Sequence, residues 1–188
     1  MTLGSTSIDA VIGALAERTP VPGGGAAAAI AAALGCAAGA MAARYTSGPK
    51  YAAIEAEARN FGDLLAAAAL DCTRLGDADA EAYAAVGAGR KTKDAIAIAE
   101  AELRAATVPA DLLALCAQHA AGLAAFIPTS NPYLVSDVKV GIHLLAGAGR
   151  AAWQTLLVNR PDATVLRVAQ THLTALDAAE QRALEPRA

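Results

Sequence analysis

Apolar residues recur at three- and four-residue steps along most of this 188-residue chain. The clearest run is Ile54, Ala58, Phe61, Leu65, Ala68, Cys72 and Leu75. This spacing places apolar side chains on one side of a helix. No stretch alternates convincingly between apolar and polar residues, as a half-buried strand would. The pattern therefore predicts an all-α fold.

Capping residues, glycines and prolines divide the pattern into about eight helices. Ser7 is a typical N-cap, and Pro109 suits the first turn of a new helix. The main predicted ranges are 8–18, 26–45, 54–86, 92–106, 109–127, 136–159 and 161–185. We expect one domain spanning residues 1–188, a helical bundle built around the second of these helices.

The second helix is free of charge, because no Asp, Glu, Lys, Arg or His occurs between Arg18 and Arg44. Its length is close to that of a membrane span. Alanine and glycine dominate it, however, and they insert far less favourably than leucine or isoleucine. We therefore predict a buried core helix and no membrane partner, with Gly35 and Gly39 allowing neighbouring backbones to approach closely.

The composition of the chain indicates which partners and which cellular compartment to expect. The net charge is −3 and no basic cluster stands out, which argues against nucleic acid. Aromatic residues make up only 4%, so each buried side chain is small and a homo-oligomer would add buried area. Cys36, Cys72 and Cys116 lie in apolar stretches and indicate core thiols in a reducing compartment. Because no secretory signal is visible, we expect a cytoplasmic protein.

The junction at residues 19–25, Thr-Pro-Val-Pro-Gly-Gly-Gly, leads directly into the charge-free helix. Prolines fix φ, glycines permit unusual backbone geometry, and the first amides of a helix lack intrahelical partners. A ligand could therefore approach bare backbone here. A tight turn that only lets two helices pack closely is the alternative.

Familiar catalytic motifs are absent. The histidines are far apart, and no HExxH, CxxC, Walker A or GxSxG pattern occurs, so we expect no metal site. The remaining polar candidates are Lys50, Asp79, Glu81, Tyr83, Asn131, Ser136 and Asp137. Each also has a structural interpretation as a solvated terminus, an exposed acidic face or a helix cap. A further stripe of Lys139, His143 and Arg150 could bind an anion or form a solvated or subunit-facing surface.

Five segments follow one another in the order seen in a known family. They are Thr19–Ala26, Tyr45–Tyr51, Asp77–Tyr83, Ala106–Pro109 and Asn131–Asp137. In these segments the chain resembles the formiminotransferase-cyclodeaminase / methenyltetrahydrofolate cyclohydrolase family. The resemblance implies an all-helical homodimer that acts on a one-carbon unit carried by tetrahydrofolate, with no bound cofactor.

Within that family the chain resembles the stand-alone members, because the segment before Thr19 is too short for a formiminotransferase domain. This favours a cyclohydrolase that interconverts 5,10-methenyltetrahydrofolate and 10-formyltetrahydrofolate by adding water. The alternative is a cyclodeaminase that releases ammonia from 5-formiminotetrahydrofolate. A second alternative is a helical dimer that binds folate without catalysis.

The methenyl substrate is already a cation, so its carbon needs no metal to polarise it. As a hypothesis, Asp79 is the general base or cation stabiliser, oriented by Tyr83, and Asp137 is the second carboxylate. Asn131 and Ser136 would join Asp137 in contacting the pterin. The segment Pro22-Gly23-Gly24-Gly25 would give the flat ring access to backbone, and Lys50 would meet a tail carboxylate or steer a proton.

Overall fold

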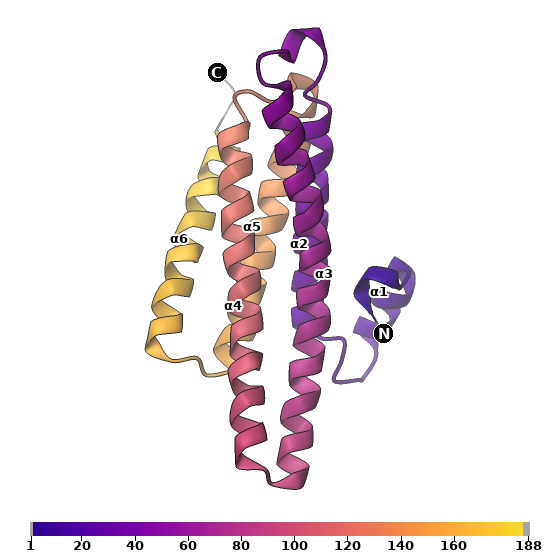
Figure 1. Cartoon of the computed structure of the whole chain (residues 1–188), viewed down its shortest axis with the longest axis vertical. Coiled ribbons are helices and arrows are strands. Elements are labelled where there is room, and N and C mark those ends of the chain that lie inside the picture. Colours follow the sequence, from indigo (N-terminus) through magenta and orange to yellow (C-terminus); the bar gives the residue numbers. More distant parts are fainter. Residues whose placement is uncertain (1, 186–188) are drawn as a thin grey trace.

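The computed structural model describes residues 2–185, and every regular element among them is helical (Figure 1). The expected all-α class is therefore confirmed. The α-helices are α1 (Ile8–Ala16), α2 (Gly24–Arg44), α3 (Glu55–Thr92), α4 (Ala95–Phe126), α5 (Val135–Val158) and α6 (Ala163–Leu184). There are also three short 3-10 helices: η1 (Leu3–Ser5) before α1, η2 (Pro49–Tyr51) between α2 and α3, and η3 (Pro132–Leu134) between α4 and α5.

Five long helices form an elongated up-and-down bundle. α2 packs against α3 and α5, α4 packs against α3 and α5, and α6 lies along α4 and α5. The α3–α4 hairpin extends beyond the other helices at the lower end of Figure 1, while α1 stands beside α3. The N-terminus of α2, the C-terminus of α5 and the N-terminus of α6 consequently meet at one end of the bundle.

The core is built from small side chains, and this allows helix backbones to touch. A Cβ atom on Gly35 of α2 would lie 3.0 Å from the carbonyl oxygen of Gly141 in α5, so a larger residue would force the two helices apart. Cys36, Cys72 and Cys116 are buried free thiols, as expected. By length and composition alone α2 and α4 could cross a membrane, but 56% of each apolar window is buried inside the bundle.

The structure corrects the expected number of helices, because residues 2–185 contain six α-helices instead of about eight. The helix predicted to end near Val86 continues through Gly87 and Gly89 to Thr92. Two further predicted helices, 92–106 and 109–127, are one continuous helix, α4, with Pro109 in its interior.

Asn159 explains why Pro109 does not end α4. Proline has no N–H, so the carbonyl four residues earlier, that of Ala105, loses its helical donor. The Asn159 side-chain amide replaces that donor, since its Nδ2 lies 2.8 Å from the Ala105 oxygen and 3.0 Å from the Thr155 oxygen. The Ala105 carbonyl of α4, left without a helical donor, therefore holds the C-terminal end of α5 in place. This contact lies beside the pocket described in the next subsection.

Candidate functional site

The glycine-rich junction forms an uncapped helix start, as the sequence indicated. Gly23 occupies the N-cap position of α2, and no side chain there accepts a hydrogen bond from the first amides. The peptide bond between Val21 and Pro22 is cis. The glycines present bare backbone at the positive end of the α2 dipole.

Asp79 of α3 lies directly over this helix start. A Cβ atom on Gly25 would be 2.1 Å from Oδ2 of Asp79, so the carboxylate occupies its present position because Gly25 has no side chain. The carboxylate is half-buried, and burial raises its pKa above the ordinary value for aspartate. Within residues 2–185 it has neither a hydrogen-bond nor an ion-pair partner.

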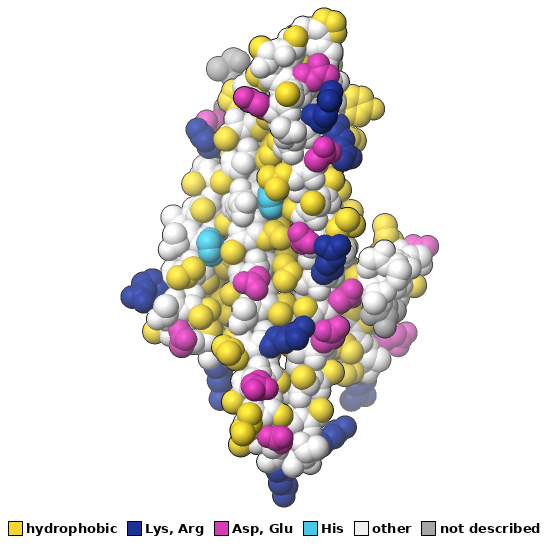
Figure 2. Space-filling view, in the orientation of Figure 1, with side chains coloured by type: hydrophobic (Ala, Val, Ile, Leu, Met, Phe, Trp, Pro, Cys, Tyr) yellow, Lys and Arg dark blue, Asp and Glu magenta, His cyan; other side chains and the backbone are white. Residues whose placement is uncertain are grey.

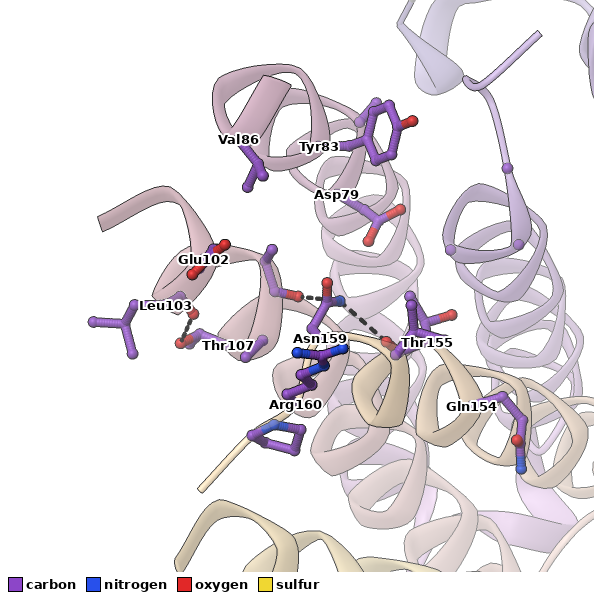
Figure 3. A pocket seen from close by; sticks show the side chains of 18 of the residues that line it. Asp79, Tyr83, Val86, Glu102, Leu103, Thr107, Gln154, Thr155, Asn159 and Arg160 are labelled. Carbon is purple, nitrogen blue, oxygen red and sulfur yellow. Dashed lines mark hydrogen bonds between the residues drawn. The ribbon is translucent and has the colours of Figure 1, made fainter. Parts of the chain in front are cut away.

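The Asp79 carboxylate faces a pocket of about 870 Å³. Its walls come from the loop before α2, the C-terminal part of α3, the N-terminal half of α4, the end of α5 and the loop into α6 (Figure 3). The lining includes Gly23, Gly24, Gly25, Asp79, Tyr83, Arg90, Glu102, Leu103, Thr107, Gln154, Asn159 and Arg160. Three of the five segments that carry the family resemblance therefore meet here, those at 19–26, 77–83 and 106–109.

Tyr83 lies one helical turn beyond Asp79 and also lines the pocket. Its side chain is 57% exposed, and among the described residues it makes no hydrogen bond to Asp79. The proximity agrees with the expected shared face, and the role of Tyr83 in orienting Asp79 stays a prediction. Tyr83 is placed to contact a ligand that enters from solvent.

The other candidates lie at the opposite end of α2. Lys50 belongs to η2, just beyond the C-terminus of α2, where its Nζ is 5.5 Å from the Tyr51 ring centre. Ser136 and Asp137 lie in the first turn of α5, and Ser136 Oγ donates to Asp137 at 3.4 Å. Since α2 has 21 residues, about 30 Å separates its two ends. A single chain does not bring these residues to Asp79.

Asn131 makes several hydrogen bonds near the C-terminal end of α2. Its Nδ2 donates to the Tyr45 carbonyl at 2.9 Å, its backbone N–H donates to Thr46 Oγ1 at 3.0 Å, and its Oδ1 accepts from the Tyr133 N–H at 3.1 Å. These bonds tie the loop between α4 and α5 to the end of α2.

The basic stripe on α5 pairs with α6. His143 Nδ1 lies 2.9 Å from Glu180 Oε1, and Arg150 binds both Glu180 and Asp177. The Arg150 guanidinium and then the His143 ring hold the pKa of Glu180 below its ordinary value, against the effect of burial. Lys139 Nζ donates to the Glu185 carbonyl at 2.8 Å. The stripe therefore fastens α6 to the bundle.

Asn159 and Arg160 are pocket residues that the sequence reasoning missed. The available signal was Pro109, because a proline inside a helix leaves a carbonyl that needs a donor from elsewhere. No group of three His, Cys, Asp or Glu side chains in the described part of the chain is arranged to hold a metal ion.

The comparison with family models decides the family. The formiminotransferase-cyclodeaminase model matches residues 7–178, which is nearly the whole chain. The chain belongs to the formiminotransferase-cyclodeaminase family. The resemblance seen in the five segments is thereby confirmed, and the chain is an enzyme of this folate-processing family.

The solved structures agree with this family. The crystal structure of formiminotetrahydrofolate cyclodeaminase from Thermotoga maritima superposes with a TM-score of 0.87 at 25% sequence identity. The match covers 96% of this chain and 94% of that one. No curated protein sequence matches the chain.

Proposed function

We propose that this protein is a methenyltetrahydrofolate cyclohydrolase and that the pocket at the N-terminus of α2 is its active site. The observation that carries the proposal is the Asp79 carboxylate, half-buried and unpaired within residues 2–185, over a helix start where Gly25 leaves room for it. A carboxylate in such a setting suits a cationic substrate, because bringing in an opposite charge relieves the cost of its burial.

The proposed reaction adds water to the cationic carbon between N5 and N10 of 5,10-methenyltetrahydrofolate. Asp79 takes a proton from the attacking water, and the carbon becomes tetrahedral. The bond from this carbon to N5 then breaks, N5 takes up a proton, and 10-formyltetrahydrofolate is released. The raised pKa makes Asp79 a stronger base than an ordinary aspartate.

The surroundings of Asp79 support this chemistry. Amides at Gly23 and Gly24 can donate to polar edges of the pterin, and Pro22 stiffens the loop that presents them. Tyr83 offers a flat surface beside the ring. Because the substrate carries its own positive charge, we propose that the reaction needs no bound cofactor or metal.

The test is a rate measurement with purified protein. The absorbance of methenyltetrahydrofolate is followed with and without the protein, and catalysis is expected to accelerate its loss far beyond the rate in buffer. Equal rates with and without protein would refute the proposal. Binding of the folate without acceleration would support a non-catalytic folate-binding dimer instead.

A cyclodeaminase is the second candidate, favoured by the structural similarity to formiminotetrahydrofolate cyclodeaminase. In that reaction N10 attacks the formimino carbon of 5-formiminotetrahydrofolate, and a general acid protonates the departing ammonia. A protonated Asp79 could supply this proton. Ammonia release from formiminotetrahydrofolate, measured beside water addition, distinguishes the two candidates.

We also propose that the protein is a homodimer, formed through α2 and α5. Charged side chains are scattered over the face shown in Figure 2, whereas α2 has no charged residue from Gly24 to Ala43. Its exposed side chains are nonetheless apolar, since Leu34 is 50% and Met41 is 40% exposed. Val140 on the adjacent α5 is 49% exposed. Such a surface suits burial against a second copy. A monomeric mass at micromolar concentration would refute the dimer.

An antiparallel dimer would also reunite the separated site residues. The far end of one copy, with Lys50, Asn131, Ser136 and Asp137, would lie against the pocket of the other. Mixing inactive Asp79→Asn with inactive Asp137→Asn protein tests this, because each mixed dimer then holds one intact site. About a quarter of wild-type activity should return, given random pairing of a two-fold dimer. No recovery after confirmed subunit exchange would place the whole site in one subunit.

A cytoplasmic location is part of the proposal. The three buried cysteines are free thiols, which suits a reducing compartment.

A further inference from the structure

Some of the charged side chains that line the pocket are hydrogen-bonded within the protein, and others are not. Glu102 Oε1 lies 3.0 Å from Arg90 Nη2. Asp162 caps α6, where its Oδ1 accepts from the amides of Thr164 at 2.7 Å and Val165 at 2.9 Å. Within residues 2–185, Asp79 and Arg160 are the lining charges whose side chains make neither a hydrogen bond nor an ion pair, and they form no ion pair with each other.

Arg160 also has an unusual backbone. Its φ is 50°, in the left-handed region where glycine or asparagine is favoured, at the position just after the C-cap of α5. An arginine here is less favourable than glycine for the backbone alone. Its side chain, however, lines the same pocket as Asp79 and Tyr83 and is drawn below them in Figure 3. Strained residues of this kind often serve a site.

Neighbouring contacts fix where Arg160 sits. The Asn159 side chain donates to the Ala105 and Thr155 carbonyls, so the end of α5 is held against α4. The backbone N–H of Arg160 donates to the Leu157 carbonyl at 3.2 Å, and Pro161 follows. The guanidinium is therefore attached to a rigid corner of the pocket and not to a free loop.

Two unpaired charges of opposite sign in one pocket suit a ligand that is cationic at one end and anionic at the other. We propose that Arg160 binds a carboxylate of the glutamate tail of the folate while Asp79 meets the cationic one-carbon end. This inference rests on the proposed function and adds a specificity-determining residue to it. The planar guanidinium can donate two parallel hydrogen bonds to a carboxylate, which gives direction as well as charge.

The experiment compares two substitutions that remove the same backbone strain. Lys93 at the end of α3 is the other described non-glycine residue with positive φ, at 58°, and it does not line the pocket. Arg160→Gly and Lys93→Gly should both keep or raise the thermal unfolding temperature, since glycine suits the left-handed backbone. Lys93→Gly is thus the matched control for any effect of flexibility.

The measured quantity is the ratio of KM for methenyltetrahydrofolate to KM for the corresponding tetrahydropteroate, which lacks the glutamate. Arg160→Gly should raise this ratio about 10- to 100-fold, as expected for loss of a hydrogen-bonded charge pair. Lys93→Gly should leave it unchanged, and Arg160→Lys should fall between. An unchanged ratio in Arg160→Gly, or equal losses with both substrates, would overturn the inference.

A binding measurement separates this inference from the proposed function. p-Aminobenzoylglutamate and p-aminobenzoate are titrated into the wild type and into both glycine variants. A preference for the glutamate compound that is lost only in Arg160→Gly supports the inference even if no turnover is found. If the wild type turns over both folates but shows no such preference, the proposed function stands and the role of Arg160 is refuted.

Discussion

The two ends of α2 differ in how their polar groups are used. At the C-terminal end, Asn131 and Thr46 bond to each other and to nearby carbonyls, so their hydrogen-bonding groups serve packing. At the N-terminal end, Gly23 supplies no cap and Asp79 lies half-buried above Gly25 without a partner in residues 2–185. Burial of an unpaired carboxylate is unfavourable for folding. The difference indicates that the bonds of Asn131 and Thr46 stabilise the bundle within one chain, whereas Asp79 is left free for a ligand.

The largest expected effect comes from Asp79→Asn. Loss of a general base should lower turnover about 10²- to 10⁴-fold. The same substitution should raise the stability of the fold at neutral pH. Because burial raises the Asp79 pKa, the folded state binds its proton more tightly than the unfolded state. The free energy of unfolding therefore falls as pH rises from about 3.9, the ordinary aspartate pKa, through the raised value.

Thermal unfolding at pH 7 checks this second effect. Asp79→Asn should unfold at a higher temperature than the wild type, because the substitution removes a buried charge. A variant that is both inactive and less stable would show that Asp79 holds the fold together, contrary to the contrast between the two ends.

Gly25→Ala tests the close approach of the Asp79 carboxylate to Gly25. Its methyl group would displace the Asp79 carboxylate, which is the end of a flexible side chain, so we expect a fall in kcat with a stability loss of only about 1 kcal/mol or less. Gly24→Ala is the matched control, because a Cβ there has no neighbour within 4 Å. Urea unfolding and initial rates measure both effects, and equal behaviour of the two variants would contradict the geometry.

Thr46→Val probes the opposite end. The Thr46 side chain is 1% exposed, donates to the Ala42 carbonyl at 3.0 Å and accepts from Asn131. Valine keeps the shape but leaves the Asn131 N–H without its acceptor, at a cost of about 1–3 kcal/mol. Urea unfolding should show this loss while KM stays near the wild-type value. A large rise in KM without loss of stability would contradict a packing role.

A smaller effect links Pro109 to Asn159. Asn159→Ala should destabilise the protein by about 1 kcal/mol, because the Ala105 carbonyl loses its donor. In a Pro109→Ala background the helix supplies an N–H to that carbonyl, and the same substitution should cost less. The double-mutant cycle is measured by urea unfolding. Additive effects would show that Asn159 does not replace the missing donor.

Local signals predicted much of the fold because they act within a few residues. Ser7 caps α1 as expected, and the charge-free stretch is a core helix. Pro109 misled the prediction, because its tolerance depends on Asn159, 50 positions later in the sequence, and no local pattern reveals that contact.

The site was predicted only in part for a similar reason. Gly25 and Asp79 could be nominated from their motifs, but their close approach depends on how α2 crosses α3. Arg160 belongs to no recognised motif, and only the three-dimensional arrangement places it in the pocket with Asp79. Lys50 and Asp137 remain candidates whose role depends on a second subunit.

The most direct test of the proposed role of Asp79 is the pH dependence of kcat/KM for methenyltetrahydrofolate, corrected for the uncatalysed rate. This profile reports ionisations of the free enzyme. The wild type should lose activity with acid at a pH clearly above the ordinary aspartate pKa of about 3.9, and Asp79→Asn should lack that transition. The same acid transition in Asp79→Asn would contradict the assignment of Asp79 as the base.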